Sequence, residues 1–286
     1  MNTTTELLAS IDLEVIDKNI FRGHSHDVGS PNVFGGQVLS QSLHAAMLTV
    51  PQERTVHSLH SYFILPGNLE IPIIFDVDHI RDGGSFTTRR VRAIQNGKVI
   101  FILSASFQEE QEGLDHQIDM KKIKGPEELI SDQALLEQFK DQLPENIRKF
   151  RRPRPVEFRP LNPMAFIAPQ KMEPRRYVWF KALGEVPNNE RTHKRIVAYA
   201  SDYNLLSTAI LPHQHEVRIN DLQLASLDHA MWFHRPVKVD DWLLFEIESP
   251  SASNSRGLAR GSVFTKDGIL VATVIQEGLM RIKRKK

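Results

Sequence analysis

A helical run without charged residues opens the first half of the chain, and strand-like runs follow it. Residues 28–52 contain no Asp, Glu, Lys or Arg, and within them residues 37–48 read as a helix that begins after the pair Gly35-Gly36. A helix without a charged face is typical of a buried helix. Runs with strand character, separated by turn signals, follow at residues 55–65, 71–80, 85–94 and 99–108. This pattern predicts a module in which an antiparallel sheet packs around one buried helix.

The same order of elements returns in the second half of the chain. A strand-like run at residues 177–182 comes before a nearly uncharged helical run at residues 196–211, and further strand-like runs follow at residues 222–234, 242–248, 258–264 and 269–276. Turn motifs also match between the halves, such as Asn96-Gly97 and Asp267-Gly268. Any antiparallel meander produces such turns, so the paired helices carry the inference. The chain is predicted to be a duplication.

A polar connector separates the two copies. Residues 109–113 are mostly polar or acidic, residues 127–150 form a charged amphipathic stretch, and several prolines follow it. Such a segment is expected to pack on the outside of the fold. We therefore divide the chain into an N-terminal module (1–112), a connector with a helix (113–174) and a C-terminal module (175–286). The predicted fold class is α+β, with two tandem repeats that each wrap an antiparallel sheet around a central helix.

The overall charge argues against polyanionic partners. The chain of 286 residues has 36 Lys and Arg against 35 Asp and Glu, so it has no net field that would hold it on nucleic acid or on an anionic membrane. No apolar stretch reaches the ~18 residues that a membrane span needs. The N-terminus carries acids and lacks a basic segment followed by an apolar run, and the C-terminus is not Ser-Lys-Leu. We expect a cytoplasmic protein that is not inserted in a membrane.

Several common catalytic motifs are missing. The chain has no cysteine, which excludes a disulfide framework, a thiolate nucleophile and Cys-ligated metal. His213 and His215 have no acid cluster beside them to complete a zinc site, and no Gly-x-Ser-x-Gly elbow exists. The pair Gly35-Gly36 lacks the Lys-Ser/Thr of a phosphate loop. We expect it to let the backbone approach closely at the start of a helix, where free N–H groups could also face a carbonyl oxygen or a phosphate. We expect neither a metal nor a cofactor.

A single acid stands out in the second helical run. Asp202 is the only charged residue of residues 196–211, and burying an ionised carboxylate costs several kcal/mol unless a partner holds it. If the helix is continuous, Asp202 points into packed structure. Alternatively, residues 196–200 form a strand and Ser201 or Asp202 caps the helix that follows. The residues leave both readings open, but the first helix contains no acid, so a catalytic carboxylate would belong to the second copy.

Two polar residues lie where strand alternation should bury them. Gln276 shares a face with Leu270, Ala272 and Val274, and Ser226 shares one with Leu222, Leu224 and Trp232. Buried amides and hydroxyls need hydrogen-bond partners. An edge position for Gln276, and a plain small residue in a crowded sheet for Ser226, are the alternatives. His229 is expected on the opposite face of the strand from Ser226, which argues against Ser226 as a covalent nucleophile with a histidine base.

Long motifs in order along the chain resemble the acyl-CoA thioesterase II family. They are Val33-Phe-Gly-Gly-Gln-Val, Val56-His-Ser-Leu-His-Ser-Tyr-Phe, Gly84-Ser-Phe with Arg89-Arg-Val, Ala105-Ser-Phe-Gln108, Tyr199-Ala-Ser-Asp202, Ala225-Ser-Leu-Asp-His-Ala-Met-Trp-Phe-His234 and Gln276-Glu-Gly278. The resemblance runs from the first helix to the last strand and is weakest in the connector. It implies a double hotdog fold, in which each half wraps a sheet around a central helix and the two sheets join.

The resemblance also implies a reaction. The family's catalytic Asp, Thr or Ser, and Gln fall by motif on Asp202, Ser226 and Gln276; many bacterial members have Thr where this chain has Ser226. Asp202 would deprotonate a water that Ser226 and Gln276 hold, N–H groups of a helix start would stabilise the oxyanion, and the substrate would be a fatty acyl-CoA. Such proteins usually associate further, so we expect a homo-oligomer, either dimer or tetramer.

Other readings of the same fold remain at this point. Hydratases and dehydratases of acyl thioesters pair a carboxylate with a histidine, and the helical run offers Asp202 no histidine within two turns on its C-terminal side. A non-catalytic acyl-CoA-binding protein would have no use for a buried base. The arginines that could meet coenzyme A phosphates are more typical of a solvated strand face; they are Arg81, Arg89, Arg90, Arg92, Arg256 and Arg260.

Overall fold

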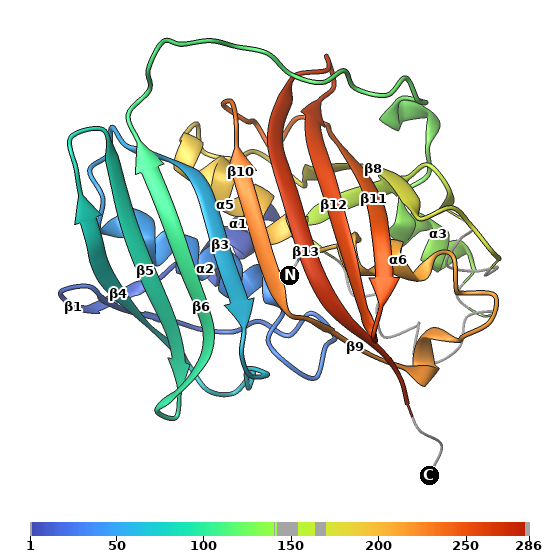
Figure 1. Cartoon of the computed structure of the whole chain (residues 1–286), viewed down its shortest axis with the longest axis horizontal. Coiled ribbons are helices and arrows are strands. Elements are labelled where there is room, and N and C mark those ends of the chain that lie inside the picture. Colours follow the sequence, from blue (N-terminus) through green and yellow to red (C-terminus); the bar gives the residue numbers. More distant parts are fainter. Residues whose placement is uncertain (1, 140, 142–153, 164–169, 284–286) are drawn as a thin grey trace.

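Antiparallel strands form one large sheet, and helices α1, α2 and α5 lie behind it in Figure 1. The computed structural model describes residues 2–139, 141, 154–163 and 170–283. The helices in this part of the chain are α1 (Thr4–Ser10), α2 (Gly35–Leu48), α3 (Asp132–Gln138), α5 (Glu190–Ser201) and α6 (Leu205–Ile210). The strands of the first half are β1 (Glu14–Asp17), β2 (Ile20–Gly23), β3 (Thr55–Phe63), β4 (Ile73–Asp82), β5 (Phe86–Gln95) and β6 (Lys98–Gln108). Those of the second half are β7 (Val156–Pro160), β8 (Arg175–Ala182), β9 (Leu222–Ser226), β10 (Asp228–Phe233), β11 (Leu243–Ser253), β12 (Arg256–Thr265) and β13 (Leu270–Ile282).

The strand order confirms the predicted duplication. The sheet runs β1-β2-β4-β5-β6-β3 and continues as β10-β13-β12-β11-β8-β7, with β9 paired to β13. Read outward from the β3–β10 junction, the two halves place corresponding strands in the same order. At that junction Ala230 lies opposite His60 in an antiparallel register. The two sheets therefore join into one, and each half contributes one central helix, α2 or α5.

Helix α2 is buried along nearly its whole length, as its lack of charge predicted. Its apolar side chains, Val38, Leu39, Leu43, Ala45, Ala46 and Met47, belong to the main core. Two of its polar side chains donate to backbone carbonyls: Gln41 Nε2 donates to the Ser10 carbonyl at 3.0 Å, and Ser40 Oγ donates to the Arg195 carbonyl at 2.9 Å. The second of these bonds ties α2 directly to α5.

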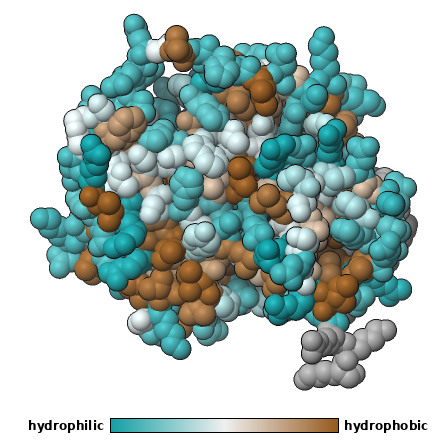
Figure 2. Space-filling view, in the orientation of Figure 1, coloured by the Kyte–Doolittle hydropathy of each residue, from teal (hydrophilic) through white to brown (hydrophobic). Residues whose placement is uncertain are grey.

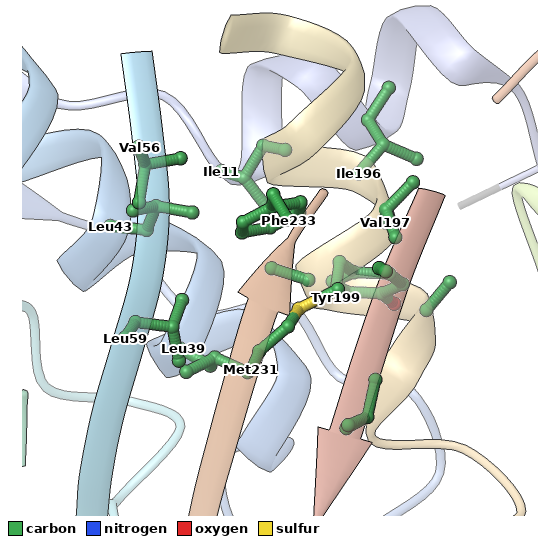
Figure 3. Close-up of a cluster of buried hydrophobic side chains, with 14 of the residues drawn as sticks. Ile11, Leu39, Leu43, Val56, Leu59, Ile196, Val197, Tyr199, Met231 and Phe233 are labelled. Carbon is green, nitrogen blue, oxygen red and sulfur yellow. The ribbon is translucent and has the colours of Figure 1, made fainter. Parts of the chain in front are cut away.

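The core between the helices and the sheet contains side chains from both halves. Figure 3 shows Leu39 and Leu43 of α2 near Leu59 and Val56 of β3, respectively, and Tyr199 of α5 near Met231 of β10. All six residues are at most 1% exposed. Complete burial of a large apolar side chain stabilises the fold by roughly 1.5–3 kcal/mol. This shared core holds the ends of α2 and α5 against the sheet at the junction of the two halves.

Helix α5 differs from its sequence prediction at both ends. It begins at Glu190 rather than at residue 196, and it therefore includes the buried cations Lys194 and Arg195. Lys194 Nζ donates to the Val56 carbonyl at 3.1 Å and forms an ion pair with Glu190, so its burial is compensated. The predicted run to residue 211 is interrupted after α5, and α6 starts only at Leu205.

The strand predicted over residues 222–234 is also interrupted. Leu227 separates β9 from β10, and its N–H donates to the Glu277 carbonyl while its carbonyl accepts from the Phe63 N–H, both at 2.9 Å. A one-residue irregularity of this kind moves the following side chains to the other face of the sheet.

The connector contributes more structure than the one helix expected. Strand β7 pairs with β8 at the far edge of the sheet, where it occupies the position that β1 has in the first half. Helix α3 lies within the amphipathic stretch, whose residues 142–150 are outside the described part of the chain. The division at residues 112 and 174 stays a prediction. Among the described residues, no helix is long and apolar enough to span a bilayer.

Candidate active site

Asp202 lies at the C-terminal end of α5. The helix ends at Ser201, Asp202 is its C-terminal cap residue, and Asn204 then adopts a left-handed conformation (φ 72°) that turns the chain into α6. Neither sequence reading was right, because residues 196–200 are helical and Asp202 ends that helix instead of beginning the next. The residue as a whole is intermediate between buried and exposed, and its carboxylate lies against Gln276, Ser226 and the start of α2.

The structure brings Asp202, Ser226 and Gln276 together, although β9 and β13 are far from α5 in sequence. Gln276 Nε2 donates to Asp202 Oδ1 at 2.6 Å and to Ser226 Oγ at 3.1 Å, and Ser226 Oγ donates to Asp202 Oδ1 at 3.4 Å. One carboxylate oxygen thus accepts from two neutral donors. The other oxygen, Oδ2, receives neither of these bonds.

The two polar residues of the sheet face inward. Gln276 is 1% exposed and shares the buried face with Ala272 and Val274, as predicted. Leu270 does not share this face, because a register shift in β13 places it in a separate cluster with Trp179, Leu244 and Phe264. Gln276 Oε1 is also buried, and it has no hydrogen-bond partner among the described residues.

Ser226 shares the inner face with Leu222 and Leu224 but not with Trp232. Beyond the break at Leu227 it is His229, Met231 and Phe233 that point inward, so the expectation for Trp232 was wrong.

The glycine pair that opens α2 contacts Asp202 across the two halves. The Gly36 N–H donates to the Asp202 carboxylate. A Cβ on Gly35 would lie 2.6 Å from Asp202 Oδ2, and one on Gly36 would lie 2.3 Å from the Tyr199 carbonyl oxygen. Both positions therefore need glycine for close approach, as the sequence indicated. The N–H that was expected to face a substrate oxygen instead faces the carboxylate.

Burial decides the acidity of Asp202. It raises the pKa of the carboxyl to about 6, while hydrogen bonds from Gln276, Gly36 and Ser226 favour the ionised form and limit the rise. The neighbouring phenols of Tyr199 and Tyr203 also have raised pKa values, mainly through burial, so they stay neutral at physiological pH. At pH 7 Asp202 is mostly ionised and still basic enough to take a proton from a positioned water.

His229 faces the inner side of the sheet, so its predicted position on the opposite face from Ser226 was wrong. The break at Leu227 turns its ring to the inner face, where it is 0% exposed and where Nδ1 lies 3.3 Å from Gln276 Nε2. Burial lowers the pKa of His229 to about 3, so the ring is neutral at any physiological pH. A buried neutral imidazole is not the acid of a hydratase-type carboxylate–histidine pair. The alternation rule alone could not find this residue, because the strand is not continuous.

The other candidate residues lie elsewhere. Arg89 is buried, not solvated, and its guanidinium donates to Asp82 and to the Thr49 carbonyl. Arg90 and Arg92 are exposed and pair with acids of β4. Within the described ranges no group of His, Cys, Asp and Glu could hold a metal ion.

A cavity of about 1290 Å³ lies on another part of the molecule, between the start of the connector and the sheet. Leu114, Lys194, Phe233 and Arg235 are among the residues that line it. Asp202, Ser226 and Gln276 do not line it. Its position therefore gives no support to a role in the chemistry of these three residues.

Comparisons with known proteins cover almost the whole chain. Residues 146–279 match the family model described as acyl-CoA thioesterase, and residues 23–108 match the model described as acyl-CoA thioesterase N-terminal domain. The chain is 40% identical to acyl-CoA thioesterase 2 of Haemophilus influenzae, covering 96% of each chain. It is also 40% identical to mouse acyl-coenzyme A thioesterase 8, covering 96% of this chain and 88% of the relative.

Solved structures agree with the sequence relatives. The acyl-CoA thioesterase II TesB2 from Mycobacterium marinum superimposes with a TM-score of 0.80 at 40% identity, covering 96% of this chain and 98% of that one. A hotdog-fold protein from Alicyclobacillus acidocaldarius superimposes with a TM-score of 0.79 at 17% identity, which supports the fold alone. The expected double hotdog is confirmed.

Proposed function

This chain belongs to the acyl-CoA thioesterase II family and is a thioester hydrolase, and we propose that it acts by direct attack of a water molecule activated by Asp202. Ser226 and Gln276 position that water and the carboxylate. The observation that carries the proposal is the hydrogen-bonded group of Asp202, Ser226 and Gln276 around one carboxylate oxygen. No covalent intermediate and no metal ion are needed, because a thioester carbonyl is electrophilic and a thiolate is a good leaving group.

The first step is proton transfer from water to Asp202. Because Oδ1 accepts from Gln276 and Ser226, Oδ2 is the oxygen that takes the proton. Gln276 Oε1, a buried acceptor without a partner among the described residues, accepts the other hydrogen of the water and so fixes its lone pair toward the substrate. General-base assistance of this kind contributes about 10²–10⁴-fold to the rate.

The second step is attack on the thioester carbon. The water oxygen forms the new C–O bond while the carbonyl electron pair moves to oxygen, and the N-terminal end of α2 beside Asp202 places a positive dipole near the developing negative charge. The intermediate then collapses and breaks the C–S bond. The protonated Asp202 returns its proton to the departing coenzyme A thiolate, a downhill transfer because a thiol has an ordinary pKa of about 8.5.

The pH dependence of kcat tests this assignment. Asp202 must be ionised to act, so kcat should be constant above its pKa and fall about tenfold per pH unit below it, with a midpoint of about 6. The measurement is the initial rate of thiol release from acyl-CoA between about pH 4.5 and 9, a range that extends well to both sides of the raised pKa of Asp202.

A matched variant sharpens the test. Ser226→Ala removes a hydrogen bond that lowers the pKa of Asp202, so the midpoint of kcat against pH should move to higher pH in this variant. A wild-type midpoint near 4, the range of an ordinary exposed carboxyl, would contradict the role of a buried base.

The physiological setting follows from the same proposal. We place the enzyme in fatty acid metabolism, with fatty acyl-CoA as substrate and free fatty acid and coenzyme A as products. The support is that relatives of 40% identity are named acyl-CoA thioesterases. A cytoplasmic location is in keeping with a relative from Haemophilus influenzae. Rates across acyl chain lengths test the substrate class, and fractionation of cells producing the protein tests the location.

A homo-oligomer is the proposed assembly. Figure 2 shows hydrophobic side chains gathered along the lower edge of the molecule, between hydrophilic ones. Large apolar side chains with more than two-fifths of their area exposed include Tyr62, Ile64, Leu65 and Phe86. A patch of exposed apolar side chains is typical of a surface that a protein partner covers. Light scattering after size-exclusion chromatography tests the proposal, and a mass of 32.7 kDa, that of one chain, would reject it.

A further inference from the structure

The buried imidazole of His229 touches the site but has no part in the mechanism above. Its Nε2 lies 2.9 Å from Ser201 Oγ on α5, and its Nδ1 lies 3.3 Å from Gln276 Nε2 on β13. The ring is 0% exposed, so it cannot meet a substrate. Any effect it has on the reaction must act through Gln276.

The hydrogen bonds determine which ring nitrogen carries the hydrogen. Ser201 Oγ donates its only hydrogen to the Ala198 carbonyl at 2.8 Å. Toward His229 the same oxygen can therefore only accept, so Nε2 is the protonated nitrogen. The neutral ring then has a lone pair on Nδ1, and the Gln276 contact is an N–H donated to that lone pair.

This lone pair distinguishes the two ends of the Gln276 amide. With Nε2 beside Nδ1, the two N–H groups of the amide face three acceptors, which are Asp202 Oδ1 at 2.6 Å, Ser226 Oγ at 3.1 Å and His229 Nδ1 at 3.3 Å, so one N–H is shared between two of them. Rotation of the amide by half a turn would place Oε1 against Nδ1, which brings two acceptors into contact and costs the lost hydrogen bond. It would also turn an N–H toward the place where Oε1 has to accept from the water.

Asp202 by itself cannot enforce this orientation throughout the reaction. While it is ionised, the carboxylate also requires the amide nitrogen at Oδ1. After Asp202 takes the proton of the water, its O–H can donate to an amide oxygen. The protonated Asp202 can therefore form a hydrogen bond with the rotated amide as well. His229 is neutral whether Asp202 is ionised or protonated, so its Nδ1 lone pair needs an N–H donor from the Gln276 amide in both cases.

We propose that His229 is a positioning residue that holds the Gln276 amide with its nitrogen toward Asp202 and its oxygen toward the nucleophilic water throughout the catalytic cycle. The inference rests on the proposed function of Asp202, Ser226 and Gln276. It assigns to Ser201 the task of fixing the imidazole tautomer from the end of α5.

The groups that face Asp202 allow a pH readout. They are Gln276 and Ser226 from the strands, the Gly36 N–H from α2, and the neutral phenols of Tyr199 and Tyr203. Arg154 lies on the ring of Tyr203, 5.4 Å from its centroid, and pairs with Asp132. Apart from Gln276, none of these groups contacts residue 229, so a shift of the Asp202 midpoint in a residue-229 variant reports a change in the orientation of the Gln276 amide.

The test compares His229→Phe with His229→Asn. Phenylalanine keeps a planar ring without an acceptor, whereas asparagine Oδ1 occupies nearly the position of Nδ1. In His229→Phe the amide can rotate when Asp202 is protonated and stabilise that form, so the midpoint of kcat should rise by about half a pH unit or more. We expect kcat at pH 7.5 to fall roughly 10- to 100-fold because the water is misplaced, with little change in KM. His229→Asn should keep the wild-type midpoint and most of kcat.

Equal losses in both variants, or His229→Phe with wild-type kcat and midpoint, would overturn the proposal. If neither variant folds, nitrogen-15 NMR of histidine-labelled wild-type protein decides, with Ser201→Ala used to identify the resonance of His229. The expected state from pH 5 to 8 is a neutral ring protonated at Nε2; a ring protonated at Nδ1, or charged, rejects the proposal. The midpoint of the wild-type enzyme tests Asp202 separately, so failure of one idea is distinguishable from failure of the other.

Discussion

Asp202→Asn should lower kcat for acyl-CoA hydrolysis by about 10³-fold or more, because the variant cannot take a proton from water while its partners stay in place. The amide oxygen of asparagine can still accept from Gln276, so the geometry of the site should persist. The measurement is release of free coenzyme A followed with a thiol reagent, at saturating substrate and pH 8.

The same substitution should not destabilise the protein. The folded-state pKa of Asp202 is about 6, above the ordinary value of 3.8, so the folded state binds its proton more tightly than the unfolded state does. The free energy of unfolding therefore decreases as the pH rises from about 4 to 6, and the ionised carboxylate costs the fold on the order of a few kcal/mol above pH 6. Removing that charge should leave the melting temperature at pH 8 equal to or above that of the wild type.

A control separates the role of this carboxylate from charge in general. Asp119 lies exposed in the connector, and Asp119→Asn should change neither kcat nor the melting temperature. Full activity of Asp202→Asn would reject the mechanism. A large loss of melting temperature would instead indicate that Asp202 supports the fold.

Gly35→Ala is the second substitution with a large expected effect on activity. Its Cβ would lie 2.6 Å from Asp202 Oδ2 and 2.9 Å from the ring of Phe63. Contacts this short force the carboxylate or the ring to move, and displacement of a reacting group by about 1 Å costs on the order of 10²-fold in rate. We expect kcat to fall by that factor, measured with the thiol assay.

Stability distinguishes the two adjacent glycines. At Gly35 the obstructing atoms belong to side chains that can shift, and alanine is a better helix former than glycine, so the melting temperature should change little. At Gly36 the obstructing atom is the carbonyl oxygen of Tyr199, 2.3 Å away in the backbone of α5. Gly36→Ala must therefore push α2 away from α5 and should destabilise the protein by about 1–3 kcal/mol.

Gly84→Ala provides the matched control for both glycine variants. A Cβ there meets nothing within 4 Å, so activity and melting temperature should equal those of the wild type. If Gly35→Ala were as active as Gly84→Ala, the close approach of α2 to Asp202 would have no catalytic importance.

Several features of the site were visible in the sequence because they violate simple patterns. A lone acid in an otherwise uncharged helical run and an amide on the buried face of a strand are costly unless partners satisfy them. The cost of burying polar groups singled out Asp202 and Gln276, and the resemblance to the family motifs suggested their catalytic roles. The packing of α2 was predicted for the same reason, since its residues offer no face to water.

Other features could not be predicted because they depend on single backbone irregularities. The left-handed Asn204 ends the helical region after Asp202, and the break at Leu227 reverses the faces of β10. A shift of one residue exchanges the inner and outer faces of a strand, which is why His229 was assigned to the wrong side. Strand β7 was missed because it is short and ends in a proline at the edge of the sheet.

The sequence by itself determined the duplicated α+β architecture and the buried character of α2, and it singled out Asp202 and Gln276 as polar residues in apolar surroundings, because hydrophobic periodicity and the cost of burying polar groups act locally along the chain. Only the tertiary structure decided that the start of α2 in the first half donates a hydrogen bond to the carboxylate at the end of α5 in the second, and that His229 faces Gln276. Those contacts join segments far apart in sequence, and they depend on the shared core and on two backbone breaks that no local pattern reports.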